Sequence, residues 1–293
     1  MQMHPKAKSE LVEATGPWRF ITRRVYRRQG GEQWVWRSRH HRKRLGQTVT
    51  ATQVLREVGV RQILWQPNKL NWWIGVTFAL GASLFVLGSI LCLAPGLAAR
   101  WDLSSLGINA IFFTGSVPFT TAAYMQLFQS ANAGDGPPDD REERKRVALL
   151  GWRPHDVGWL SCALQFVGTI LFNFNTFDAM IPGMDWLQED LTVWLPDVLG
   201  SVLFLASGYL AYAETCHASW GWKPSSLSWW ITFVNLLGCI AFMVSALFAF
   251  VPPKTPDFDA AGISLGFTLL GALGFLVGAL LMLPETATED SHT

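Results

Sequence analysis

Charged residues are scarce in this sequence of 293 residues: only 15% are Asp, Glu, Lys or Arg, against about 25% in an average soluble domain. Half of the residues are hydrophobic, which excludes a disordered chain and argues against a water-soluble enzyme. The four cysteines form no CxxC pair, so a disulfide scaffold is excluded. Walker loops, dinucleotide-binding glycine motifs, nucleophile elbows and HExxH motifs are also missing. We therefore expect no catalytic site, no cofactor and no metal.

Six long apolar stretches account for most of the hydrophobic residues, and none of them contains Lys or Arg. A helix needs roughly 20 apolar residues to cross a bilayer core about 30 Å thick. The first stretch begins too far into the chain for a cleavable signal peptide. The predicted fold class is an all-α integral membrane protein with six transmembrane helices. They cover residues 71–93, 105–129, 157–181, 195–215, 228–251 and 262–283.

Basic residues are distributed very unevenly along the chain, although the formal net charge is only +1. Residues 1–69 contain 15 Lys and Arg against 4 Asp and Glu, whereas residues 70–293 contain 8 against 18. With six spans, 21 basic residues fall on the side of the termini, and only Arg100 and Lys254 fall on the other. The positive-inside rule then places both termini in the cytoplasm, and we expect the protein in the cell (inner or plasma) membrane.

Twelve of the 15 tryptophans lie near predicted span ends. An indole ring has an apolar body and one N–H donor, so it prefers the boundary between lipid tails and headgroups. We interpret these tryptophans as membrane anchors. The alternative, stacking on sugars or bases, lacks the groove-building motifs of such proteins.

Glycine and phenylalanine recur at one spacing in all six spans. A helical side chain leans toward the N-terminus, so each Phe ring is expected to cover the turn that holds the Gly four residues earlier. Small residues also let helices approach closely in lipid. We therefore predict three tandem helical hairpins, arranged around a pseudo-threefold axis or in a row. The pairs are Gly81 and Phe85, Gly115 and Phe119, Gly168 and Phe172, Gly200 and Phe204, Gly238 and Phe242, and Gly271 and Phe275.

The hairpins divide the chain into six predicted segments. The linker between the first two hairpins is rich in Gly, Pro and Asp, which predicts mobility at residues 131–140, followed by a short surface helix over residues 141–150. The segments are a basic cytoplasmic N-terminal region (1–69), hairpin repeat 1 (70–129), a cytoplasmic linker (130–156), hairpin repeat 2 (157–215), hairpin repeat 3 (216–283) and a cytoplasmic tail (284–293).

A family resemblance rests on the same motif. A Trp-led span with Gly-Ser-x-x-Phe, followed by a similar second span, resembles the YrhK-like group of small bacterial membrane proteins. Gly115-Ser116, Gly200-Ser201 and the pairs Trp72-Trp73 and Trp229-Trp230 carry the likeness, which covers one hairpin at a time. The resemblance implies a bacterial integral membrane protein with no assigned reaction and no known site residues. Three hairpins and a long basic N-terminal region depart from that pattern.

The N-terminal region interleaves arginine with aromatic residues. Each basic residue near an anionic bilayer surface contributes about 1 kcal/mol to binding, so we expect this region to dock on anionic lipid headgroups. A cytoplasmic protein partner is the alternative, and nucleic acid is not expected because no helix-turn-helix, RRM or zinc-finger spacing is present. The predicted lipid-binding residues are Arg23, Arg24, Arg27, Arg28, Arg39, Arg42, Lys43 and Arg44.

Two local structures compete for the same segment. A β-hairpin on Gly30-Gly31 would place Val25 opposite Trp36 and Tyr26 opposite Val35. An amphipathic helix over residues 17–28 is the alternative. Further along, Thr50-x-x-Gln53 favours a capped helix that runs to residue 65.

Polar residues within the spans provide the candidates for chemistry. Asn109, Asn173, Thr176, Asp178 and Asp197 lie in the outer part of spans 2–4, and they could form a vestibule for a cation or small solute. Hydrogen bonding between helices is the alternative reading. The leading expectation is a non-enzymatic multi-pass membrane protein of unknown molecular activity. The alternative function is a small-solute or ion transporter that uses these residues.

Overall fold

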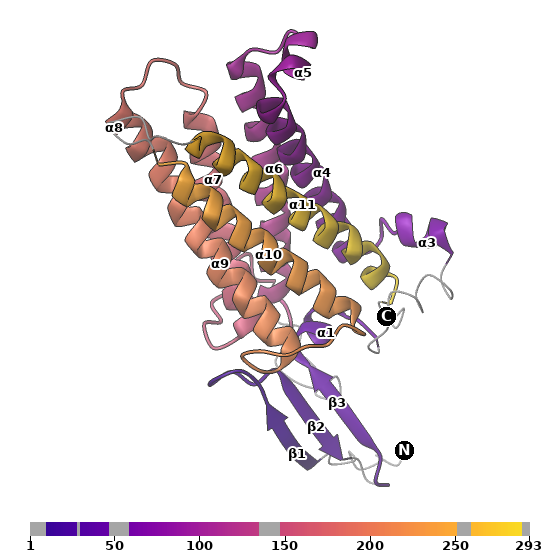
Figure 1. Cartoon of the computed structure of the whole chain (residues 1–293). Coiled ribbons are helices and arrows are strands. Elements are labelled where there is room, and N and C mark those ends of the chain that lie inside the picture. The colour runs from indigo at the N-terminus through magenta and orange to yellow at the C-terminus, as the bar shows by residue number, and fades with distance from the viewer. Residues whose placement is uncertain (1–9, 28–29, 47–58, 135–146, 251–258, 289–293) are drawn as a thin grey trace.

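Six long helices dominate the computed structural model, which describes residues 10–27, 30–46, 59–134, 147–250 and 259–288 (Figure 1). All six are long and apolar enough to cross a membrane, as predicted, and the predicted ends lie within three residues of the observed ones. Their bounds are α4 (Leu70–Leu93), α6 (Ser105–Ala131), α7 (Val157–Asp178), α9 (Leu195–Cys216), α10 (Leu227–Phe248) and α11 (Ala260–Thr286).

The six helices close into a ring. Each helix packs against the next one in the chain, and α11 packs just as extensively against α4. A simple row of hairpins would leave the first and last helices apart, so the contact between α11 and α4 excludes that arrangement. Figure 1 shows the yellow α11 crossing beside the purple α4.

Phenylalanine side chains fill the middle of this ring. A Cβ atom on Gly168 would lie 2.8 Å from Phe204, and one on Gly200 would lie 2.8 Å from Phe172. Each ring therefore covers the glycine of the facing helix, rather than the glycine of its own helix as predicted. The reason is that the two glycines let the backbones approach, so the dent of one helix opens toward the other. The same exchange joins Gly81 with Phe119, Gly115 with Phe85, Gly238 with Phe275 and Gly271 with Phe242.

Together the six phenylalanines form one buried aromatic cluster. Rings from different pairs touch: Phe85 and Phe172 both contact Phe242, and Phe119 and Phe204 both contact Phe275. Each of the six is at most 6% exposed. The cluster therefore separates the two ends of the ring from each other.

Short helices lie at the end of the ring that is far from the N-terminus. α5 (Pro95–Arg100) connects α4 to α6, and α8 (Trp186–Glu189) continues through a π turn, η1 (Asp190–Trp194), into α9. The π turn falls just before Pro196, whose missing N–H and bulky ring disturb the regular hydrogen-bond ladder. Together α8, η1 and α9 form one continuous helical stretch, Trp186–Cys216, whose α9 part coincides with the predicted fourth span.

The N-terminal residues form a three-stranded antiparallel sheet, which the all-α class did not include. It contains β1 (Glu10–Thr15), β2 (Arg23–Arg27) and β3 (Gln33–Arg37) in that order. The hairpin alternative is therefore right and the helix alternative wrong. The predicted register was off by one residue, because Val25 pairs with Val35 and Tyr26 pairs with Trp34. We call the described residues 10–46 the head.

Several predictions concern residues outside the described ranges. The mobile linker at 131–140 and the helices predicted at 50–65 and 141–150 fall largely there. In the described parts, α3 (Val60–Leu64) is helical, whereas residues 147–150 are not.

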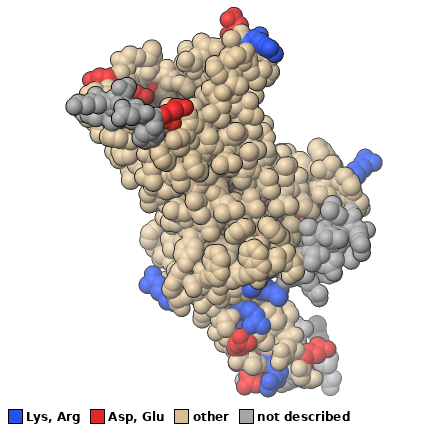
Figure 2. All heavy atoms as spheres, in the orientation of Figure 1, with Lys and Arg blue, Asp and Glu red and all other residues tan. Residues whose placement is uncertain are grey.

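Charged side chains gather at the two ends of the molecule. Figure 2 shows the surface of the helical bundle between its ends as uncharged on that face. Acidic residues and one basic residue mark the end far from the head, and basic residues are mixed with acidic ones at the head. The apolar band suits a lipid surround.

Candidate functional site: a capped chamber at the head end of the bundle

A short helix of the head closes one end of the ring. α1 (Ser38–Lys43) begins directly after β3 and lies at the ends of α6 and α9 (Figure 1). Its Arg42 donates hydrogen bonds of 2.7 and 2.9 Å to the two carboxylate oxygens of Glu214 in α9. Ser38 Oγ donates to the same carboxylate at 2.7 Å. Because all of these groups are buried, this clamp holds the head to the bundle with charge-assisted hydrogen bonds.

A second buried carboxylate clamps the same helix to α11. Glu285 accepts hydrogen bonds from Arg39 at 2.8 and 3.0 Å and from Lys43 at 2.7 Å. Ser228 of α10 also donates to it at 2.6 Å. The segment predicted as a cytoplasmic tail (284–293) therefore begins within α11, which runs to Thr286 and carries this anchor in its last turn.

The buried position of Arg39, Arg42 and Lys43 corrects the expectation that all eight predicted basic residues face lipid. Their exposure is 7%, 9% and 3%. A cation without a partner is costly in a nonpolar surround, and the two glutamates offer such a partner inside the protein. Burial, and then the charge of Arg39, lower the pKa of Lys43 to about 8. The sequence shows a run of basic residues here, but nothing in it indicates that Arg39, Arg42 and Lys43 are internal.

The remaining predicted lipid-binding residues occupy the surface of the head. Arg27 and Arg44 are exposed, Arg23 pairs with Glu13 at 2.9 Å, and the guanidinium of Arg24 lies 5.0 Å from the ring centre of Trp36. Arg28 lies outside the described residues. The basic surface is therefore smaller than the sequence indicated.

Three equivalent positions mark the head end of the ring. Gln129, Glu214 and Glu285 each follow the second glycine of their helix pair by fourteen residues. Gln129 donates to Asn71 Oδ1 at 3.0 Å, in the place where Glu214 and Glu285 receive the cations of α1. This spacing is readable in the sequence, but the Gly and Phe pattern by itself does not include it.

The pattern Trp-x-Pro-x-x-x-x-Trp at the start of α4, α7 and α10 is a second sequence feature that the prediction of the repeat did not include. In each copy the second indole N–H donates to a backbone carbonyl upstream, at 2.9 Å in all three cases. The first tryptophan of each copy is exposed by 64–82%, so only this one fits the predicted anchor role. The copies are residues 65–72, 152–159 and 222–229.

In each copy, the residue after the first tryptophan forms a hydrogen bond from its side chain to the neighbouring helix pair. Gln66 donates to Leu283 O at 3.1 Å, Arg153 to Ser130 O at 3.2 Å, and Lys223 to Cys216 O at 2.8 Å. Each bond goes to a carbonyl in the last turn of a long helix, where regular intrahelical donors run out. The contact that closes the ring, at Gln66, is thus the same kind as the two contacts inside it.

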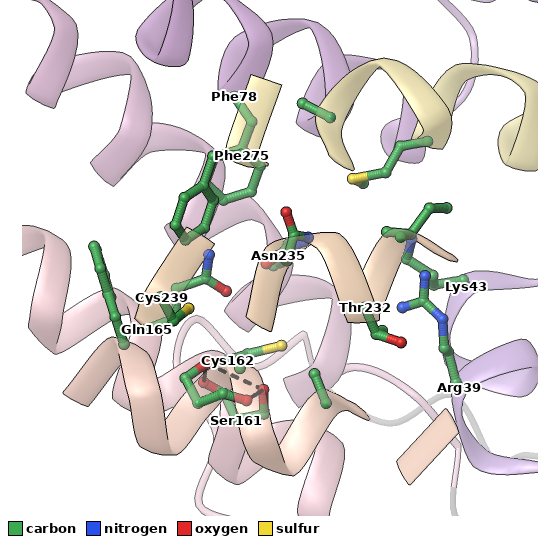
Figure 3. Close-up of a pocket in the computed structure, with 18 of the residues that line it drawn as sticks. Arg39, Lys43, Phe78, Ser161, Cys162, Gln165, Thr232, Asn235, Cys239 and Phe275 are labelled. Carbon is green, nitrogen blue, oxygen red and sulfur yellow. Dashed lines mark hydrogen bonds between the residues drawn. The ribbon is translucent and has the colours of Figure 1, made fainter. Parts of the chain in front are cut away.

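Beneath α1 lies a chamber of about 70 Å³ with mixed polar and apolar walls, in the head half of the ring (Figure 3). Arg39 and Lys43 stand at one side of it, and Phe78 and Phe275 lie on the opposite side (Figure 3). The amide and hydroxyl side chains on its walls are Gln126, Gln129, Gln165, Asn235, Ser161, Ser207 and Thr232.

The five residues of the predicted outer solute site do not line this chamber. Asn109 donates to Ala179 O at 2.6 Å, and Asn173 donates to Thr120 Oγ1 at 2.9 Å. Thr176 donates to Ser116 Oγ at 3.2 Å. These hydrogen bonds join α6 to α7 and to Ala179 just after it. They agree with the alternative prediction of hydrogen bonding between helices. Asp178 and Asp197 lie near the same end, on α7 and α9.

No group of three or more His, Cys, Asp or Glu within the described ranges could hold a metal ion. The four cysteines are free, and three of them are buried. Asp156 caps α7 by accepting from the backbone N–H groups of Gly158 and Trp159.

The comparisons with known proteins add no relative. The chain matches no family model, and neither the curated proteins nor the solved structures contain a match. The resemblance to the YrhK-like group therefore stays a prediction.

Proposed function

We propose that this chain is a non-enzymatic multi-pass protein of the cell (inner/plasma) membrane whose head binds anionic lipid at the cytoplasmic surface. Both termini would then lie in the cytoplasm, as the excess of basic residues at the head end favours. The membrane part would consist of three tandem hairpin repeats around a pseudo-threefold axis. The recurring Gly–Phe exchange, Trp-x-Pro bonds and polar positions at the head end support that repeat.

The observation that carries the lipid proposal is the loop between β1 and β2. Trp18 packs edge-on against Tyr209 of α9, with ring centres 5.7 Å apart. Trp18 and Ile21 remain 58% and 49% exposed, and Arg19 beside them is exposed as well. Tyr209 lies seven residues before the end of α9, a depth of about 10 Å along a helix. An exposed Trp, Ile and Arg at that level are the residues expected at a headgroup boundary.

A transporter that uses the outer polar residues has less support. Three of those residues are engaged in hydrogen bonds with neighbouring helices, and the aromatic cluster separates them from the chamber. A cytoplasmic protein that binds the exposed edge strand β1 is the alternative occupant of the head.

The test uses the full-length protein in detergent with added phosphatidylglycerol or phosphatidylcholine. We expect more phosphatidylglycerol to be retained in native mass spectra, and salt to reduce this excess. The double substitution Trp18→Ser and Arg19→Gln should remove it, whereas the control Arg100→Gln at the opposite end should not. Equal retention of the two lipids by the unmodified chain would refute the proposal.

A further inference from the structure

The chamber under α1 collects one set of equivalent positions from all three helix pairs. Phe78, Gln165 and Asn235 each follow the second Trp of their Trp-x-Pro motif by six residues, and all three line the chamber. Gln126 on α6, Ala211 on α9 and Met282 on α11 also line the chamber. Each of them follows the second glycine of its helix pair by eleven residues. The space therefore lies where the three pairs converge, as Figure 3 shows for Gln165 and Asn235.

Amide groups around the chamber lack protein partners. Within the described part of the chain, the side chains of Gln126, Gln165 and Asn235 make no hydrogen bond, and Asn235 Oδ1 is fully buried. A buried amide without a hydrogen bond costs about 1–3 kcal/mol. One buried acceptor without a partner, Asn235 Oδ1, and two part-buried amides on the same walls, Gln126 and Gln165, indicate that a polar species occupies this space. A water needs about 10–15 Å³ of such volume, so the chamber has room for a solute of about five non-hydrogen atoms.

Helix α1 forms the roof of the chamber, and the ionic groups there carry more positive than negative charge. Among the residues that the structure describes, Arg39, Arg42 and Lys43 pair with two carboxylates, those of Glu214 and Glu285. Arg42 also feels the charge of Asp156, but this carboxylate has its own cation in Arg153, 3.7 Å away.

One donor in this roof is left over. The side chain of Arg39 is 8% exposed, and its Nε–H has no partner among the described residues although Arg39 lines the chamber. In a nonpolar surround, an uncompensated cation and a spare charged donor favour an anion.

We propose that the chamber binds a small oxyanion, of the size of inorganic phosphate or a short carboxylate, beneath the basic roof. Arg39 Nε and the charge of Lys43 attract its oxygens, and the amide N–H groups of Gln165 and Asn235 donate to it. The aromatic cluster closes the chamber toward the far end, so the anion exchanges only with the head side. This site is separate from the lipid-binding surface on the outside of the head.

The test is isothermal titration of the purified full-length protein with inorganic phosphate, sulfate and acetate, and with glycerol as a neutral solute. We expect saturable binding of at least one oxyanion and none of glycerol. Gln165→Leu and Asn235→Leu should each weaken binding about tenfold, the value of one hydrogen bond to a charged group. The control Asn173→Leu removes an amide outside the chamber and should leave binding unchanged.

Gln129→Glu is the sharpest variant, because it adds a third carboxylate at the position equivalent to Glu214 and Glu285. This carboxylate supplies the negative charge that the roof lacks, so oxyanion binding should be lost. Binding of glycerol equal to that of the anions overturns the proposal. So does the absence of binding for all three anions, or unchanged affinity in Gln129→Glu.

Discussion

Single glutamates hold the head to the membrane part. Removing one member of a buried ion pair leaves the other charge without compensation, at a cost of about 3–5 kcal/mol. Glu214→Gln should therefore loosen the head, seen as faster hydrogen–deuterium exchange at residues 10–46. The control is Glu13→Gln, which breaks the exposed pair with Arg23 and should cost less than about 1 kcal/mol. Equal exchange in the two variants would contradict the clamp.

We expect His217 to make the attachment of the head dependent on pH. Burial, followed by the charges of Lys223 and Arg37, lowers its pKa from 6.5 to about 3, and its ring bonds Thr22 Oγ1 at 3.0 Å. A detached His217 binds a proton below about pH 6.5, whereas the attached one stays neutral. Attachment is therefore complete above that pH and weakens as pH falls toward 3.

The same exchange experiment checks this prediction between pH 7 and pH 4. His217→Gln keeps a hydrogen-bonding group but does not titrate, so the head should lose part of its pH dependence. An identical pH profile in the variant would assign the effect to other groups.

The helix pairs depend on contacts that no side chain larger than hydrogen allows. A Cβ on Gly168 would lie 2.8 Å from Phe204 and 3.2 Å from Gly200 O, so Gly168→Leu forces α7 and α9 apart. Overpacking of this kind costs about 1–3 kcal/mol or more. We expect a lower thermal midpoint in detergent. Gly266→Leu is the matched control, because a Cβ at Gly266 on α11 meets no atom within 4 Å, and it should have little effect.

The ring as a whole has two unlike ends, and this difference predicts its orientation. Gln33 in β3 and Gly96 in α5 are both exposed and lie at opposite ends (Figure 1). In intact cells, a membrane-impermeant maleimide should label Gly96→Cys and not Gln33→Cys, and permeabilised cells should show both. The unmodified chain is the control, because three of its four cysteines are buried. The opposite labelling pattern would reverse the proposed orientation.

The sequence alone determined the six spans and their ends, because lipid imposes a length and an apolar composition that are visible one residue at a time. It also predicted the glycine positions, since a close approach of helices requires small residues. The sheet was one of two alternatives that the local pattern left open.

Only the tertiary structure decided which charges are internal. The arginines that bind the bundle and those that face the solvent belong to the same run of basic residues. No local sequence feature distinguishes the buried Arg42 from the exposed Arg44. The difference arises because Glu214 and Glu285, far along the chain, come to lie beneath α1 when α11 closes against α4. The same closure brings Gln126, Gln165 and Asn235 around one chamber, a contact between distant segments that no single stretch of sequence encodes.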